Sequence, residues 1–415
     1  MRKITSILLI ILSFAKKGAK FGMRLPSSVE GLGVGLLILT TSCEREPLLH
    51  LYDSADADFT LPIVTLDLEV YWDYEIGYNV SYDWHAEWNY DWDETDKSIW
   101  GDIGYAEPKI FNLRRYYTGD KQYGPHTTVS AHRLETTSFQ GRFDWGYWDL
   151  LVWNEISSLG GVQSIHIDEE STLESVTAYT NPSMNASRYQ APRYTRSFYE
   201  PEALFAAYDT GIEINRNLDG FVYDAERNVY VKHLSMELQP ITYIYLTQVI
   251  LRNNNGRVTS VDGNANLSGM ARSTTLNTGR SGSDPITVYY NVRMKKDLPI
   301  NHPIRGLTKG ERTDIIGGRL MSFGLCSTAA NFISRADEID DPYHHYMDVT
   351  MQFNNGMDST FVFDVTDQVR SRYKGGVITV VLDMDTIPSP TRKGGSGFDA
   401  VVKDFEDGGT WEFDM

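Results

Sequence analysis

Apolar and polar residues alternate with a period of two along most of the chain after residue 59. Within residues 60–70, for example, every second position from Val64 to Val70 is apolar. Side chains of a β-strand point alternately to its two faces, so the pattern predicts a strand with one buried face. Further strands are predicted at residues 111–117, 126–134, 137–143, 148–154, 173–179, 230–238, 242–251, 286–294, 319–325, 348–353, 360–365, 377–383, 398–402 and 411–413.

Helical periodicity is almost absent from the chain. Only residues 200–207 are predicted to form a short helix, with Pro201 near its start, where the missing N–H costs little. Many short strands separated by turn residues at intervals of about 8–12 positions are typical of β-sandwiches. The predicted fold class is therefore all-β, and the strongly apolar stretch 148–154 is expected to be a central strand.

The first 42 residues differ from the rest. Their two apolar runs, 4–14 and 31–39, are shorter than the roughly 20 residues that a spanning helix needs. The second run ends in small residues directly before Cys43, where the composition becomes acidic and aromatic. This is typical of a bacterial lipoprotein signal, so residues 1–42 are expected to be removed and Cys43 to carry the lipid. Thr40 stands where leucine is usual, which leaves ordinary signal cleavage nearby as an alternative, and either Met1 or Met23 as the start.

The remaining length of about 370 residues suggests two domains. A polar stretch rich in glycine, asparagine and aspartate lies around residues 216–228. We place the domain boundary there, which predicts an N-terminal β-sandwich at residues 43–220 and a C-terminal β-sandwich at residues 221–415.

The net negative charge of the chain argues against some classes of binding partner. The whole chain has 38 Lys+Arg and 56 Asp+Glu, a net charge of −18. Six basic residues and one acidic residue fall in the first 42, which leaves 32 basic against 55 acidic residues, a net of −23. Such a surface repels nucleic acid and anionic lipid head groups, so neither is expected as a partner.

The chain has only two cysteines, Cys43 and Cys326. If Cys43 is acylated, no intrachain disulfide can form, and large secreted β proteins can fold without one. Cys326 lies in an apolar stretch and is expected to be a buried thiol rather than a nucleophile.

Eight of the nine tryptophans lie between positions 72 and 153. Trp84, Trp88 and Trp92 alternate with Ala86 and Tyr90 at a period of two. One interpretation is a strand that packs these rings into a core. The other is a ligand or partner surface on which sugar rings stack. Both interpretations stay open at this point.

The sequence gives little support for a catalytic site or a metal site. The chain has no nucleophile elbow, P-loop, HExxH or CxxC pattern, and acid pairs such as Asp73 and Glu75 are expected by chance among 55 carboxylates. His344 and His345, with Asp341 and Asp348 nearby, are the best metal candidate, but adjacent residues on a strand point to opposite faces, so the two imidazoles would not easily share an ion. The run 91–96 lacks the glycine and distal glutamate of an EF-hand and is expected to be a solvated acidic turn. We therefore expect no enzyme activity, no cofactor and no metal.

Several short sequence segments carry a family resemblance. They are Cys43 with the following EREPL, residues 141–155 (GRFDWGYWDLLVWNE), 266–271 (NLSGMA), 365–369 (VTDQV), 394–402 (GGSGFDAVV) and the end 411–415 (WEFDM). In order and spacing they resemble the Bacteroides-type lipoproteins related to fimbrillin-like and minor-fimbria anchor proteins. The tryptophan-rich insert at residues 84–100 departs from that pattern.

The resemblance implies two tandem transthyretin-like (Greek-key) β-sandwiches. It also implies a lipid anchor in the outer membrane, a location at the cell surface, and a role in fimbrial anchoring, assembly or adhesion, with fimbrial or other surface-protein subunits as partners. An exposed edge strand can pair with a strand of another chain. We expect such an edge in the second sandwich near residues 377–383. A glycan-binding surface lipoprotein that uses the tryptophans of the first domain is the alternative.

Overall fold

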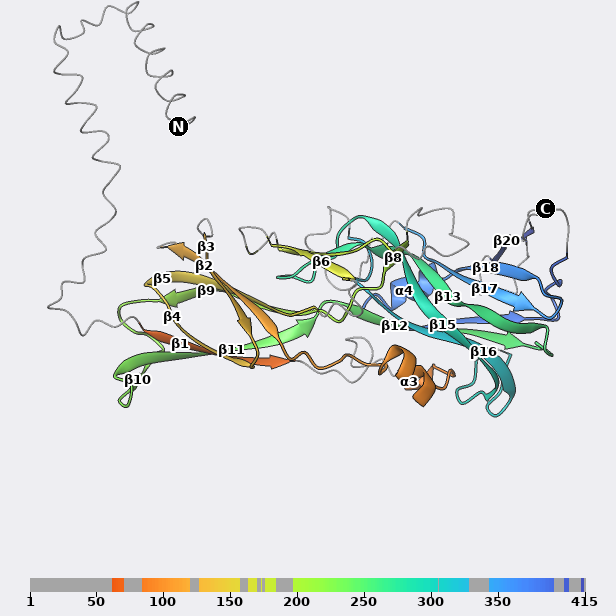
Figure 1. Ribbon diagram of the computed structural model, residues 1–415, viewed down its shortest axis with the longest axis horizontal. Coiled ribbons are helices and arrows are strands. Elements are labelled where there is room, and N and C mark those ends of the chain that lie inside the picture. The colour runs from red at the N-terminus through yellow and green to blue at the C-terminus, as the bar shows by residue number, and fades with distance from the viewer. Residues whose placement is uncertain are drawn as a thin grey trace, which may run out of the picture. The chain divides into compact units, whose positions relative to one another are not determined.

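The computed structural model describes residues 62–70, 84–119, 127–156, 163–169, 173, 176–183, 197–304, 306–327, 343–391, 399–402 and 412–413 (Figure 1). The predicted signal, residues 1–42, and Cys43 lie outside this range. Within it, no helix is long and apolar enough to cross a membrane.

The first sheet has eight strands in the order β3-β2-β5-β9-β11-β1-β4, with β10 paired to β11. Its strands are β1 (Ile63–Val70), β2 (Phe111–Gly119), β3 (Thr127–Leu134), β4 (Ser138–Arg142), β5 (Gly146–Asn154), β9 (Phe205–Ile214), β10 (Val222–Asp224) and β11 (Val229–Pro240). Strands β9 and β11 pair at only two positions, Phe205 with Pro240 and Ala206 with Gln239. The strands diverge beyond these pairs (Figure 1). The sheet surrounds one apolar cluster, which includes Leu66, Leu150 and Leu238.

The second sheet has ten strands in the order β19-β12-β16-β15-β13-β17-β18-β20-β21, with β8 paired to β15. Its strands are β8 (Ser197–Tyr199), β12 (Tyr243–Arg252), β13 (Val258–Ala271), β15 (Pro285–Pro299), β16 (Arg312–Ser322), β17 (Tyr346–Phe353), β18 (Asp358–Asp364), β19 (Gly376–Asp383), β20 (Asp399–Val402) and β21 (Glu412–Phe413). This sheet encloses its own apolar cluster, to which Leu267, Val288 and Phe361 belong.

A small third sheet joins β6 (Ile165–Asp168), β7 (Thr177–Thr180) and β14 (Ser273–Thr275) in the order β14-β7-β6. Strand β5 is buried on both faces: Leu150 lies in the core of the first sheet, and Trp153 packs in another cluster with Ala178 of β7. It also pairs with β2 on one side and β9 on the other. The prediction of a central strand at residues 148–154 is therefore confirmed.

The predicted all-β class with two β-sandwiches is confirmed. The predicted helix at residues 200–207 is wrong, because Phe205 begins strand β9. Phe205 and Ala207 pack in the first core, and β9 pairs with β5 along its length. These long-range contacts outweigh a weak local helix preference. The two described α-helices are α3 (Glu94–Trp100) and α4 (Thr366–Ser371), with one 3-10 turn at Trp84–Ala86.

The division into residues 43–220 and 221–415 stays a prediction. Strands β10 and β11 follow residue 220 in the chain, yet they belong to the first sheet together with strands that precede it. Conversely, β8 pairs with β15 of the second sheet.

Candidate functional site

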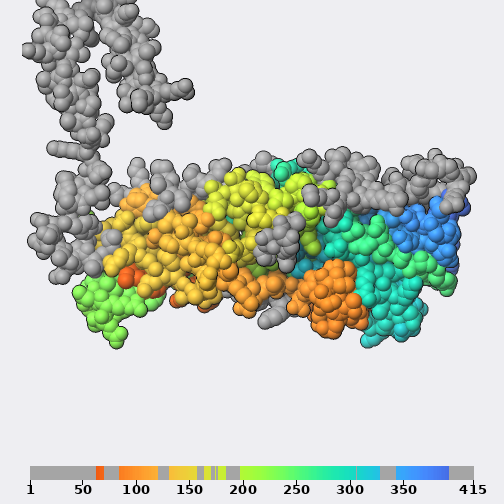
Figure 2. Space-filling view, in the orientation of Figure 1, coloured from red at the N-terminus to blue at the C-terminus, as the bar shows by residue number. Residues whose placement is uncertain are grey.

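The tryptophan segment, defined here as residues 84–105, lies over the second sheet. Trp84, Trp88 and Trp92 are each less than a tenth exposed. They share an apolar cluster with residues of β12 and β16, among them Ile244 and Ile315. Figure 2 shows the segment in orange, lying directly beside teal atoms of the second sheet. These rings pack into the protein and do not offer a stacking face to solvent.

The backbone of this segment is not the strand that its alternation predicted. Trp84 lies in the 3-10 turn, and Asp93 caps helix α3 by accepting from the N–H groups of Thr95 and Asp96. The prediction of a strand is wrong because the rings pack on a sheet distant in sequence, and no neighbouring strand pairs with this stretch. Burial does agree with the core interpretation of the three tryptophans.

Asn89 holds the segment to the second sheet by hydrogen bonds. Its backbone N–H donates to Oε1 of Gln248 over 2.7 Å. Its side-chain oxygen accepts from the N–H groups of Asn301 and His302 at 2.9 and 2.8 Å. Gln248 in turn donates to the carbonyl oxygen of Glu87 over 2.8 Å. The N–H of Asn89 and the carbonyl oxygen of Glu87 belong to no sheet, and the side chain of Gln248 forms the hydrogen bonds that a neighbouring strand would otherwise supply.

A buried carboxylate completes this attachment. Asp96 is fully buried, and its oxygens lie 2.9 Å from Arg293 and 2.6 Å from Lys295 of β15. Tyr90 also donates to Asp96 over 3.2 Å. Burial, followed by the charge of Asp96, raises the pKa of Tyr90 far above its usual range. The expectation of a solvated acidic turn at residues 91–96 is therefore wrong for Asp96, because two cations of β15 pair with it.

Strand β19 lies at one end of the second sheet and pairs in parallel with β12, from Gly376 beside Tyr245 to Asp383 beside Arg252. Backbone groups of successive residues in a strand point to opposite edges. Gln368 of α4 occupies the outer edge at Thr379. Its side-chain amide donates to the Thr379 carbonyl over 3.0 Å and accepts from the Thr379 N–H over 2.9 Å. One side chain thus satisfies both backbone groups of Thr379, as a neighbouring strand would.

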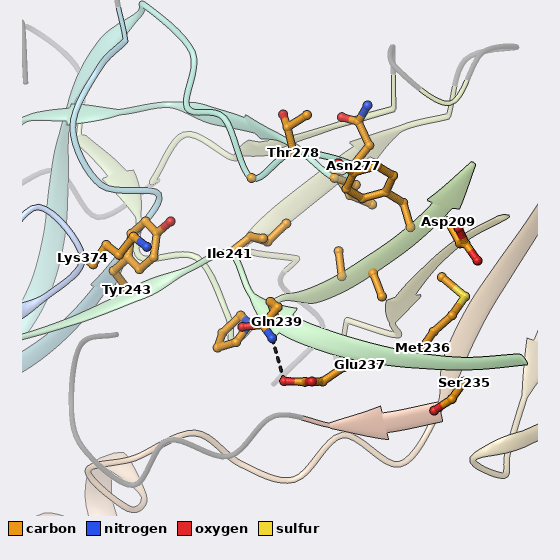
Figure 3. A pocket seen from close by; sticks show the side chains of 16 residues that line it. Asp209, Ser235, Met236, Glu237, Gln239, Ile241, Tyr243, Asn277, Thr278 and Lys374 are labelled. Atoms are coloured by element: carbon orange, nitrogen blue, oxygen red, sulfur yellow. Dashed lines mark hydrogen bonds between the residues drawn. The ribbon is translucent and has the colours of Figure 1, made fainter. Parts of the chain in front are cut away.

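A cavity of about 460 Å³ opens where β9 and β11 diverge; we call it the fork pocket (Figure 3). In Figure 3, Glu237 and Gln239 of β11 lie on one side, and Asn277 and Thr278 on the other. Gln239 donates to Glu237 over 2.8 Å. The lining residues are Ala206, Ala207, Tyr208, Asp209, Ser235, Met236, Glu237, Gln239, Pro240, Ile241, Tyr243, Leu276, Asn277, Thr278, Gly279 and Lys374. The periodicity of the sequence carries no signal of this pocket, because it depends on how two strands separate.

A second buried carboxylate lies in the second sheet. Asp348 of β17 accepts from the side-chain amide of Asn266 of β13 over 2.8 Å, and both residues are buried. Burial raises the pKa of Asp348 to about 7. An aspartate between Met347 and Val349, in a predominantly apolar part of the strand, is the sequence signal that could have identified it.

The structure describes three of the four cysteines and histidines singled out from the sequence. Cys43 lies outside the described residues. His345 is buried, with Nδ1 3.2 Å from the Ser268 carbonyl oxygen, whereas the His344 side chain is 62% exposed. The described residues contain no group of three or more His, Cys, Asp or Glu side chains arranged to hold a metal. Cys326 is buried, as predicted, with its sulfur 3.7 Å from the Gly269 carbonyl oxygen.

No protein-family model matches the chain, and no curated protein matches it. Solved structures do resemble it. A candidate adhesin from Bacteroides ovatus has a TM-score of 0.45 and 13% identity, covering 80% of this chain and 96% of that one. A candidate adhesin from Bacteroides thetaiotaomicron has a TM-score of 0.42 and 9% identity, covering 79% and 93%. The fimbrial anchor protein Mfa2 from Porphyromonas gingivalis has a TM-score of 0.39 and 12% identity, covering 78% and 91%.

Proposed function

We propose that this chain is a non-enzymatic, lipid-anchored protein of the outer membrane, exposed at the cell surface. It acts as a fimbrial anchor, assembly or adhesion component and contacts other subunits through a β-strand. The observation that carries the proposal is the position of β19 at the end of the second sheet, paired with β12 alone within the described part of the chain. An edge strand gives affinity through its main chain and specificity through its alternating side chains.

The geometry of β19 defines how a partner strand would add to it. Thr379 and Val381 are two positions apart, so their backbone groups point to the same edge, the one that Gln368 covers at Thr379. A strand of another fimbrial subunit would take over the two hydrogen bonds that Gln368 makes. Gln368 therefore competes with the partner and protects the edge until a partner is present.

Replacing Gln368 by alanine is expected to increase the affinity of the protein for a co-expressed fimbrial subunit about thirty-fold. The reason is that a partner strand no longer has to displace two neutral hydrogen bonds, each worth roughly 1 kcal/mol net. The measurement is a titration of the purified subunit against wild type and variant by calorimetry.

Asp367→Asn serves as the control for Gln368→Ala, because Asp367 is the preceding residue of α4 and is exposed. It should leave the affinity unchanged. Equal affinities for wild type and Gln368→Ala would show that the partner does not use this edge.

Replacing Cys43 by alanine is expected to move the protein from the membrane fraction to the soluble fraction, because a multiply acylated cysteine holds a protein far more firmly than a single chain does. Fractionation of cells followed by immunoblotting measures this. Cys326→Ser is the matched control and should stay in the membrane fraction, since this thiol is buried. A Cys43→Ala protein that remains with the membrane would contradict lipid anchoring.

The partner class is tested by purifying the acylated protein with whatever it binds in its own cells. Recovery of fimbrial subunits supports the proposal. Recovery of porin-like sugar importers in their place would favour a role in glycan capture.

A further inference from the structure

We propose that the fork pocket is a binding site for a neutral saccharide. The site is separate from the edge of β19, so the inference is independent of the proposed strand-mediated role. It also differs from a platform built on Trp84, Trp88 and Trp92, whose rings are buried.

The pocket is built into the fold. Strands β9 and β11 pair only through Phe205 and Ala206 and then separate. Strand β9 is bent further along by a register shift opposite β5, where Gly211 has a φ of 69° and donates its N–H to buried Asp149 over 2.6 Å. Bulges of this kind bend a strand and increase its twist. The separation of the two strands is therefore set by their other neighbours, since β9 pairs with β5 through this bulge and β11 pairs with β1.

The lining combines an apolar part with a polar rim. Ala207, Met236 and Ile241 supply apolar surface, while Glu237 and Asn277 supply oxygen and amide groups on opposite sides (Figure 3). A pyranose ring has the same division, with C–H groups on its faces and hydroxyls around its edge. The volume of about 460 Å³ lies within the range of roughly 300–1,000 Å³ typical of small-molecule sites.

An exposed aromatic ring lies at this site. Tyr208 lines the pocket and is 48% exposed, which makes it one of few large apolar side chains on the surface of the described residues. Aromatic rings with a polar tip provide a large contact area with one apolar side and one wet side. Tyr208 can therefore cover one face of a sugar ring.

The charged residues that line the fork pocket favour neutral over acidic saccharides. Asp209 and Glu237 are acidic, and Lys374 is the single basic residue of the lining. Carboxylates accept hydrogen bonds from sugar hydroxyls but repel uronic and sialic acids. Asp209 is partly buried, and this burial, followed by the nearby charge of Asp149, raises its pKa. The ligand class is therefore a neutral sugar.

The experiment titrates the full-length protein with maltotriose, mannotriose and trigalacturonate, monitored by calorimetry and by saturation-transfer NMR. We expect at least one neutral trisaccharide to bind in the millimolar range or tighter and trigalacturonate to bind at least ten-fold more weakly. Tyr208→Ala should weaken binding of the neutral sugar about ten-fold, whereas Tyr208→Phe should retain it, because the ring makes the contact.

Tyr223→Ala provides the matched control, because Tyr223 of β10 is 50% exposed but does not line the pocket. It should leave binding unchanged. Absence of binding by both neutral sugars, equal binding of trigalacturonate, or equal effects of Tyr208→Ala and Tyr223→Ala would each overturn the inference. None of these outcomes bears on the fimbrial role, which is measured with the Gln368 and Cys43 variants.

Discussion

Replacing Asp96 by alanine is expected to lower the free energy of unfolding by about 3 kcal/mol, because it breaks a buried ion pair and removes the buried partner of Lys295. Asp96 is fully buried, and Lys295, 2.6 Å away, has a side chain that is only 8% exposed. Asp93 lies 3.0 Å from Lys295 and retains part of the compensation. The estimate is therefore at the lower end of the values measured for broken buried pairs.

Chemical denaturation monitored by tryptophan fluorescence measures this effect. Asp96 anchors the segment that carries Trp84, Trp88 and Trp92. In the variant we therefore expect these rings to become more exposed to water and the tryptophan emission to shift to longer wavelength. Glu94→Ala is the matched control in the same helix, because the Glu94 side chain is 89% exposed and forms an ion pair with exposed Lys97. Similar losses for both variants would show that the buried pair is not what stabilises the segment.

Replacing Asp348 by asparagine is expected to remove a large part of the pH dependence of stability. The folded-state pKa of Asp348 is about 7, well above its ordinary value of 3.8. As the pH rises from about 4 to 7, the unfolded chain loses this proton while the folded protein keeps it. The contribution to stability is therefore complete below pH 4 and is lost as the pH rises through 7. About three pKa units correspond to a loss of roughly 4 kcal/mol.

The measurement is the free energy of unfolding of wild type and Asp348→Asn between pH 4 and 8. The difference between them should grow in favour of the variant by about 4 kcal/mol over this range. Asparagine has the same shape and no charge, so it should keep a hydrogen bond with Asn266. Asp367→Asn, at an exposed position of α4, should run parallel to wild type. A parallel curve for Asp348→Asn would contradict the raised pKa.

Much of the fold could be predicted from local patterns. Strands predicted at 148–154 and 377–383 correspond to β5 (Gly146–Asn154) and β19 (Gly376–Asp383). This works because the period of two follows from the geometry of the strand itself. Local reasoning failed at residues 200–207, where pairing of β9 with β5 decides the conformation.

The candidate sites depended more on distant contacts. The aromatic character of residues 84–92 predicted burial as one possibility, but the surface that covers these rings comes from strands more than 150 residues later. The cations that pair with Asp96 lie about 200 residues away, so no local pattern reveals them. Gln368 and Thr379 are only 11 residues apart, but they meet because α4 lies beside the edge of β19, which the period of two does not predict.

By itself, the sequence determined that this is an all-β protein with two sandwiches, since the alternation of side chains along a strand is a local property of the backbone. It also carries the prediction of lipid attachment at Cys43, which depends on neighbouring residues alone. Only the tertiary structure decided that Trp84, Trp88 and Trp92 are buried, that Gln368 bonds to the backbone of Thr379, and that β9 and β11 separate to form a pocket. Each of these requires separate elements of the fold to meet, and such contacts are set by packing rather than by local periodicity.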